Sequence, residues 1–168
     1  MLAPMSTIAG QLAFVVGSYH LLKHNKGKGV MIGHMDDMDP RVVTVIGAGV
    51  AGTQSILKAI DNKALVKVVD SSQSKLDDLK SKYGTENVEY ILSSKDSIQV
   101  SVNESDLVIG SVYVVGKEAP KVVTKDMLSS MNPGTVMVDV SIDQGGCFET
   151  SKPTTHDSPT FLENDIVH

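Results

Sequence analysis

The fold is decided by residues 42–52, Val42-Val43-Thr44-Val45-Ile46-Gly47-Ala48-Gly49-Val50-Ala51-Gly52, where a β-branched run leads directly into a G-x-G-x-x-G pattern. The glycine pattern alone is a weak signal. Here a helical periodicity begins at Val50, and Asp70 ends the next β-branched run, 18 residues after Gly52. A strand, a glycine turn and a helix followed by an acidic strand end are the context of a dinucleotide-binding turn. The stretch therefore predicts that dinucleotide phosphates face the N-terminus of the helix that starts near Val50.

Each glycine of this turn has its own expected role. Gly47 permits the tight turn, Gly49 lets the backbone approach the pyrophosphate, and Gly52 allows close helix packing. The free N–H groups at the start of the helix would face the phosphates. Two alternatives stay open, because the same turn occurs without a ligand and in proteins that bind S-adenosylmethionine.

Asp70 is expected to accept hydrogen bonds from the adenosine ribose hydroxyls. Its negative charge would repel a 2′-phosphate. Ser71 and Ser72 follow it, where an NADP site would favour arginine. The sequence therefore predicts NAD rather than NADP. The alternative is that Asp70 is only a solvated carboxylate at a strand end.

Further apolar runs alternate with helical stretches along the rest of the chain. Continuous Val/Ile/Leu runs are typical of strands buried on both faces of a parallel sheet. Their alternation with helices predicts an α/β fold with a Rossmann-type, doubly wound parallel sheet. The predicted strands are 42–46, 65–69, 88–92, 107–109 and 135–140, with a further strand starting at 166–168, and the predicted helices are 50–60, 75–83, 95–103 and 124–131.

The first 40 residues predict a helix and a connecting loop ahead of a single Rossmann domain at 41–168. Apolar residues recur at helical spacing from Ile8 to Leu22, with Ser6 as the expected N-cap, and this stripe should face the core or an interface. The segment is shorter than the ~20 apolar residues of a membrane span, and no basic residue precedes it. We therefore expect a helix of a soluble protein. The loop that follows is polar and contains Asp36, Asp37 and Asp39.

Composition and charge exclude several classes of protein. The 168 residues fit one domain, and 41% hydrophobic with 21% charged residues is typical of a globular protein. The net charge is -5 without a Lys/Arg run, which argues against a nucleic-acid partner. The single cysteine, Cys147, is expected to be structural in a reducing cytoplasm. His20 and His24 lie four residues apart without a third ligand, so no metal site is predicted.

From Leu2 to His168 the chain resembles the nucleotide-binding half of alanine dehydrogenases. The resemblance is carried by segments 3–6, 9–10, 45–52, 119–120, 131–134, 138–146 and 153–157. The run Ile142-Asp143-Gln144-Gly145-Gly146 is the most specific of them. The NAD-binding subunit of proton-translocating transhydrogenase is similar over much of the stretch but departs at this run. That subunit and a non-catalytic nucleotide-binding module are the competing interpretations.

The resemblance also implies which residues contact the cofactor. They are Ser6, the pyrophosphate turn with Val50 and Ala51, Asp70 and Lys75 near the adenosine ribose, Ser93 beside the adenine, Val112 and Tyr113 toward the nicotinamide, and Val140, Ser141, Ile142 and Asp143 around the nicotinamide ribose. Tyr113 stands where the family usually has a small aliphatic residue.

The chemistry implied by the resemblance is oxidative deamination of L-alanine to pyruvate and ammonia, with hydride transfer to NAD. Asp143 is the one candidate for proton transfer, and the alternative is that it only orients the ribose. In the family, a preceding substrate domain supplies a histidine, a lysine and an arginine, and it is absent from this chain. We therefore expect no alanine oxidation by the chain alone. The expected partners are that missing domain and further copies in a homo-oligomer.

Overall fold

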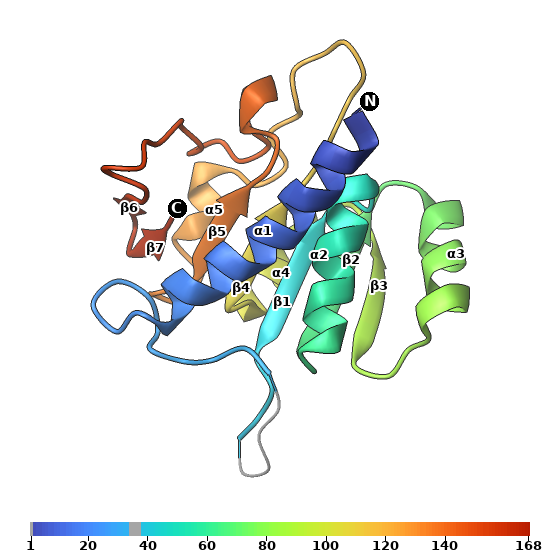
Figure 1. Ribbon diagram of the computed structural model, residues 1–168, viewed down its shortest axis with the longest axis horizontal. Helices are drawn as coiled ribbons and strands as arrows, with labels where there is room; N and C mark the ends of the chain where they lie inside the picture. Colours follow the sequence, from blue (N-terminus) through green and yellow to red (C-terminus); the bar gives the residue numbers. More distant parts are fainter. Residues whose placement is uncertain (1, 34–37) are drawn as a thin grey trace.

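The computed structural model describes residues 2–33 and 38–168, drawn in Figure 1. Asp36 and Asp37 of the expected polar loop lie outside the described residues. The elements are α1 (Leu2–Leu22), β1 (Val42–Ile46), α2 (Val50–Asp61), β2 (Leu65–Asp70), α3 (Gln73–Tyr83), β3 (Val88–Leu92), α4 (Lys95–Glu104), β4 (Leu107–Gly110), α5 (Lys125–Leu128), β5 (Val136–Asp139), the short 3-10 helix η1 (Ile142–Gln144), β6 (Leu162–Glu163) and β7 (Ile166–Val167).

The strands form one seven-stranded sheet in the order β3-β2-β1-β4-β5-β7-β6. All neighbouring pairs are parallel except β6 with β7. The chain moves outward from β1 to β3, then crosses to β4 on the other side of β1. The predicted doubly wound parallel sheet is therefore confirmed. In such sheets ligands bind outside the carboxyl ends of the strands where the order reverses, here between β1 and β4.

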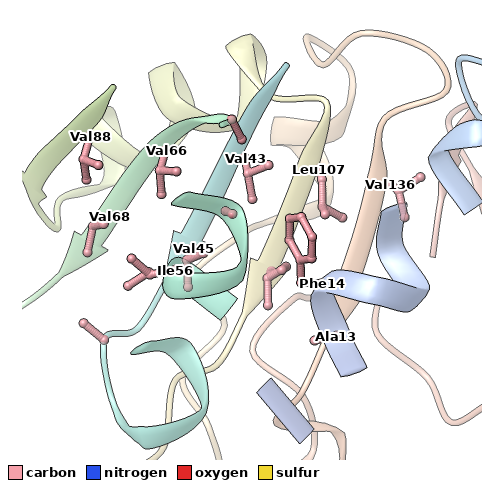
Figure 2. Packing of buried hydrophobic residues seen from close by; sticks show 14 of the residues in the cluster. Ala13, Phe14, Val43, Val45, Ile56, Val66, Val68, Val88, Leu107 and Val136 are labelled. Carbon is pink, nitrogen blue, oxygen red and sulfur yellow. The ribbon is translucent and has the colours of Figure 1, made fainter. Parts of the chain in front are cut away.

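Two hydrophobic clusters hold helices on opposite faces of this sheet. Alternate strand residues point to opposite sides, so Val43, Val45 and Val66 face one cluster with Ile56 of α2 and Phe14 of α1 (Figure 2). The other cluster joins Ile46, Val69, Val108 and Met137 of the strands to α4 and α5 through Ile98, Val102, Met127 and Leu128. The buried β-branched runs that predicted the strands therefore supply both layers of the core.

Helix α1 differs from the sequence expectation in its start and in the face that it buries. It begins at Leu2, so Ser6 lies inside the helix and is not its N-cap. The apolar stripe from Ile8 to Leu22 does not face the core. Its residues Ile8, Leu12, Val15, Val16, Tyr19 and Leu22 are 45–59% exposed. The expectation that the stripe faces the core is therefore wrong, and its alternative, that the stripe faces an interface, stays a prediction.

The buried face of α1 consists largely of small residues. Helix α1 crosses α2 so closely at Gly10 that an added Cβ there would lie 2.0 Å from the carbonyl oxygen of Ala51. A Cβ at Gly17 would lie 2.5 Å from a methyl carbon of Leu107 in β4. Ala13 and Phe14 fill the space between these two contacts and are buried. Close packing at Gly10 and Gly17, together with the buried side chains of Phe14 and Leu21, holds α1 on the domain.

The last two strands form a hairpin, and its first strand, β6, was not predicted from the sequence. Strands β6 and β7 are antiparallel and are joined by Asn164 and Asp165, with φ of 51° and 60°. Positive φ at both central residues is the geometry of a two-residue type I′ turn, which Asn and Asp tolerate well. Strand β7 adds to β5 through Val136 and Val167, so the strand expected at 166–168 is confirmed.

Within residues 2–33 and 38–168, no helix combines the length and apolar character needed to cross a membrane.

Candidate dinucleotide-binding site

The Gly47–Gly52 turn connects β1 to α2 at the carboxyl edge of the sheet. Gly47 has φ of +97°, a conformation that favours glycine, and an added Cβ would meet the carbonyl oxygen of Ser111 at 2.7 Å. A Cβ on Gly52 would lie 1.8 Å from the carbonyl oxygen of Gly47. These contacts give Gly47 and Gly52 the turn-forming and packing roles that the sequence predicts.

Gly49 is different, because an added Cβ there would meet nothing within 4 Å. Gly49 is the N-cap residue of α2, and its position carries no side-chain capping hydrogen bond. The first N–H groups of a helix have no partner within the helix, and they carry its positive dipole end. Open space in front of uncapped N–H groups fits an anionic ligand such as a pyrophosphate. The turn therefore has the cradle that a dinucleotide requires.

Ser111 supports the turn from the neighbouring strand, and the sequence analysis did not identify it. The residue directly follows β4 and is buried. Its hydroxyl donates to the carbonyl oxygen of Gly47 at 2.6 Å, and its backbone N–H donates to Ile46 at 2.8 Å. A polar residue two positions after the apolar run 107–109 was the available signal. Ser111 thus fixes the height of the turn above the sheet.

Asp70 ends β2, beside the glycine turn, as predicted. Its side chain is only 7% exposed. One carboxylate oxygen accepts from the N–H of Ala48 at 2.7 Å, and the other accepts from the N–H of Ser72 at 2.8 Å. Each carboxylate oxygen offers about two acceptor sites, so capacity remains for ribose hydroxyls. Asp70 is therefore not a freely solvated strand end, because it joins the glycine turn to the start of α3.

The adenosine side of the site lies along α3 and the end of β3. The Lys75 ammonium is 3.7 Å from an Asp70 carboxylate oxygen. Ser93 follows β3 and donates its backbone N–H to the Asp70 carbonyl at 2.9 Å. An open groove of about 450 Å³ lies here, lined by Ala48, Gly49, Val50, Thr53, Gln54, Lys75, Asp78 and Leu79. The structure thus places Asp70, Lys75 and Ser93 together on one side of the turn.

The expected nicotinamide side lies on the other side of the turn, after β4 and β5. Val112 and Tyr113 follow Ser111, and Tyr113 is 59% exposed. Val140 and Ser141 follow β5, and the Ser141 hydroxyl donates to the Val112 carbonyl at 2.8 Å. Ile142 and Asp143 come next, in η1, and Asp143 is exposed. These residues therefore form one continuous rim beside the turn.

Ser6 lies near the same carboxyl edge of the sheet because α1 begins there. The N-terminal half of α1 crosses the start of α2, where the Ser55 hydroxyl donates to the Gly10 carbonyl at 2.7 Å. Figure 1 shows the N-terminal end of α1 on the side of the loops that follow β4 and β5. Ser6 is half-buried one turn before Gly10. All cofactor-contact candidates thus lie along one edge of the sheet.

The loop after β5 is held by two residues that the sequence analysis missed. The Asp139 carboxylate accepts from the backbone N–H groups of Ser141 at 2.9 Å and Cys147 at 2.8 Å. The Lys121 ammonium donates to the carbonyl oxygens of Gly145 and Gly146, the latter at 2.7 Å. Asp139 and Lys121 are polar residues at positions where the chain enters the carboxyl edge of the sheet or faces it. Their partners lie in a returning loop, which periodicity cannot locate.

Burial shifts the pKa values of Cys147 and His168 away from neutral pH. Burial, followed by the nearby Asp139 carboxylate, raises the pKa of the Cys147 thiol to about 12. Burial likewise lowers the pKa of His168 to about 4, so its ring is neutral at pH 7. Among residues 2–33 and 38–168, no cluster of three or more His, Cys, Asp or Glu side chains is suited to a metal ion.

A doubly wound sheet with this glycine turn and an acidic β2 end defines the class of dinucleotide-binding α/β domains. Comparison with known proteins then gives the family. Residues 13–168 match the family described as "Alanine dehydrogenase/PNT, C-terminal domain". The chain belongs to this family and represents its NAD-binding domain.

Curated relatives agree with this assignment over the whole chain. An alanine dehydrogenase of Halomonas elongata is 46% identical over 168 residues, covering 100% of this chain and 45% of the relative. An alanine dehydrogenase of Mycobacterium tuberculosis is 45% identical over 168 residues, covering 99% of this chain and 45% of the relative. The chain therefore spans about 45% of the length of the curated relatives that it matches.

Solved structures confirm the fold. An L-alanine dehydrogenase superposes with a TM-score of 0.95 at 38% identity, covering 99% of this chain and 46% of that one. A transhydrogenase from Sinorhizobium meliloti superposes with a TM-score of 0.82 at 23% identity, covering 99% and 47% of the two chains. The second likeness concerns the fold alone.

Proposed function

We propose that this chain is the NAD-binding half of an L-alanine dehydrogenase, the enzyme that oxidises L-alanine to pyruvate and ammonia. One observation carries the proposal: the open turn at Gly49 lies beside Asp70 in a chain 46% identical to an alanine dehydrogenase. The run Asp143-Gln144 favours this activity over that of a transhydrogenase subunit. Bound NAD would supply the hydride acceptor.

Different residues along the carboxyl edge of the sheet would bind different parts of NAD. The α2 N-terminus at Gly49 would bind the pyrophosphate, and Asp70 with Lys75 would bind the adenosine ribose. Within the rim, residues 140–143 would contact the nicotinamide ribose. The Asp70 carboxylate would select NAD over NADP, because it would repel a 2′-phosphate.

Asp143 is the proposed proton-transfer residue of this half. It is exposed in η1, which follows the end of β5 after two residues, next to the expected nicotinamide position. A carboxylate in this position would accept a proton from the attacking water or from the substrate amine. The competing role is orientation of the nicotinamide ribose. The two roles differ in their effect on NADH affinity.

We predict that the purified chain forms no NADH from L-alanine above background. Catalysis requires the reacting groups in near-attack geometry, and the family's substrate-binding groups are supplied by another domain. Adding a separately produced substrate domain of a related alanine dehydrogenase should restore alanine-dependent NADH formation. Absorbance of NADH, measured with each component alone and with the mixture, tests this prediction.

Three results of this experiment would change the interpretation. Turnover by the chain alone would contradict its predicted inactivity. Intact NADH binding without recovered activity would favour a non-catalytic nucleotide-binding module. In the mixture, Asp143→Asn should lower kcat with NADH affinity unchanged, whereas a parallel loss of NADH affinity would assign Asp143 to ribose orientation.

We also propose that copies of the chain associate through the exposed stripe of α1. Apolar patches of this kind mark contact surfaces, and Ile8, Leu12, Val15 and Tyr19 lie on one helix face. Sedimentation velocity at tens of micromolar should show an oligomer. The double substitution Leu12→Glu/Val15→Glu should shift it to monomer, whereas Val100→Glu on α4, also at an exposed apolar residue, should not. A monomeric unsubstituted chain would contradict self-association.

A further inference from the structure

The loop after β5 leaves the sheet at Asp139 and returns to the same side chain. One Asp139 carboxylate oxygen accepts from the N–H of Ser141, two residues onward, at 2.9 Å. The other accepts from the N–H groups of Cys147 at 2.8 Å and Phe148 at 3.2 Å, and from the Ser151 hydroxyl. Residues 140–147 therefore form a closed loop whose two ends are held by one carboxylate.

The loop is also attached to the segment that follows β4. The Ser141 hydroxyl donates to the Val112 carbonyl at 2.8 Å, and the N–H of Ala119 donates to the Gln144 carbonyl at 3.0 Å. The Lys121 ammonium holds the Gly145 and Gly146 carbonyls. These contacts fix the middle of the loop against its neighbour. Asp139 fixes where the loop starts and ends on the sheet.

The packing around Asp139 leaves little room for another arrangement. Gly146 has φ of +77°, and an added Cβ would lie 2.8 Å from an Asp139 carboxylate oxygen and 2.7 Å from Cβ of Ser151. A Cβ at Gly110, next to this region on β4, would lie 2.4 Å from the Cys147 sulfur. The end of the loop, at Gly146 and Cys147, therefore packs against the Asp139 carboxylate and against the backbone of β4 at Gly110.

The order of the strands indicates which half of a bound dinucleotide would lie next to this loop. Asp70 follows β2 and the glycine turn follows β1, while residues 140–147 follow β5, two strands beyond β1 on the opposite side from β2. A dinucleotide with its adenosine ribose at Asp70 and its pyrophosphate at Gly49 would extend over β4 toward this loop. The loop would therefore face the nicotinamide half of such a ligand and not its adenosine half.

We propose that Asp139 is a positioning residue for the nicotinamide half of the cofactor. By accepting from both ends of the 140–147 loop, it sets the position of Val140–Asp143, including the Asp143 carboxylate. The inference rests on the proposed NAD site, because the loop matters only if a nicotinamide nucleotide lies beside it. Asp139 itself contacts the loop and acts through it.

Asp139→Asn tests this role by replacing a carboxylate that only accepts hydrogen bonds with an amide whose nitrogen cannot accept. NADH and ADP are titrated by calorimetry, because ADP carries the adenosine and the pyrophosphate but neither the nicotinamide nor its ribose. We expect NADH affinity to fall at least tenfold while ADP affinity changes less than twofold. A general loss of structure would instead lower both affinities together.

Asp106→Asn is the matched control at the opposite edge of the sheet. The Asp106 carboxylate also accepts a backbone N–H, from Val42 at 2.9 Å, and it pairs with Lys28 at 2.7 Å. This variant should leave the ratio of NADH to ADP affinity unchanged, whatever it does to stability. If Asp139→Asn does not fold, Ser151→Ala removes one donor to the same carboxylate and should show a smaller loss confined to NADH.

The outcomes separate this inference from the proposed function. Equal losses for NADH and ADP, or no loss for either, would overturn the positioning role of Asp139 and leave the NAD site intact. Failure of the unsubstituted chain to bind either nucleotide would overturn the NAD site itself.

Discussion

Gly52→Ala should both destabilise the domain and abolish tight NADH binding. The added Cβ would lie 1.8 Å from the Gly47 carbonyl oxygen and 2.6 Å from the Ser111 hydroxyl. Real side chains do not reach such distances, so the start of α2 must move away from β1. Overpacking of this kind costs about 1–3 kcal/mol, and the shift also breaks up the pyrophosphate cradle. We expect a lower Tm in thermal unfolding and at least a tenfold weaker NADH affinity.

Gly49→Ala is the matched substitution within the same turn. Gly49 has φ of -75°, and its added Cβ meets nothing within 4 Å, so the free protein should keep its stability. NADH affinity should still fall, because the methyl group occupies the space through which the pyrophosphate approaches the backbone. A Gly52→Ala protein with unchanged Tm and unchanged NADH affinity would contradict the packing described for the turn.

Asp70→Asn should weaken NADH binding and reduce the preference for NADH over NADPH. The substitution removes the charge that would repel a 2′-phosphate, and it leaves one acceptor oxygen where Asp70 now serves Ala48 and Ser72. Hydrogen bonds to charged groups contribute about 1.5–3 kcal/mol, which corresponds to about a tenfold to hundredfold loss of affinity. Parallel fluorescence titrations with NADH and NADPH measure both effects.

Asp77→Asn supplies the control, because it makes the same change of charge on α3. Asp77 is exposed and accepts only from Gln73 on its own helix, at 2.9 Å, among the contacts that the structure describes. It should leave the ratio of NADH to NADPH affinity as in the unsubstituted chain. An Asp70→Asn protein with the original preference would show that the carboxylate does not select the cofactor.

The strands and the glycine turn could be predicted from the sequence because their signals are local. Val42–Ile46 and Val88–Leu92 are runs rich in apolar residues, and the structure has them as strands with the same bounds. The expected helix at 124–131 is shorter, with α5 covering only Lys125–Leu128. The first and last residues of a helix or strand depend on contacts with other parts of the chain, whereas the apolar run inside it can be recognised from the sequence itself.

Features that depend on distant contacts could not be predicted in the same way. The apolar stripe of α1 was identified, but whether large or small residues face the core depends on how closely α1 approaches α2 at Gly10. Strand β6 has two residues, too few to show a period. Ser111 and Asp139 act through partners 64 and 8 residues away, Gly47 and Cys147, which become neighbours only in the folded chain.

The most direct test of the central claim is a titration of the unsubstituted chain with NADH, and in parallel with NADPH, followed by the fluorescence of the nucleotide. The chain contains no Trp, so the nucleotide signal stands alone. We expect saturable NADH binding with little response to NADPH, as the open turn at Gly49 and the Asp70 carboxylate require. Absence of NADH binding, or equal binding of the two nucleotides, would contradict the account.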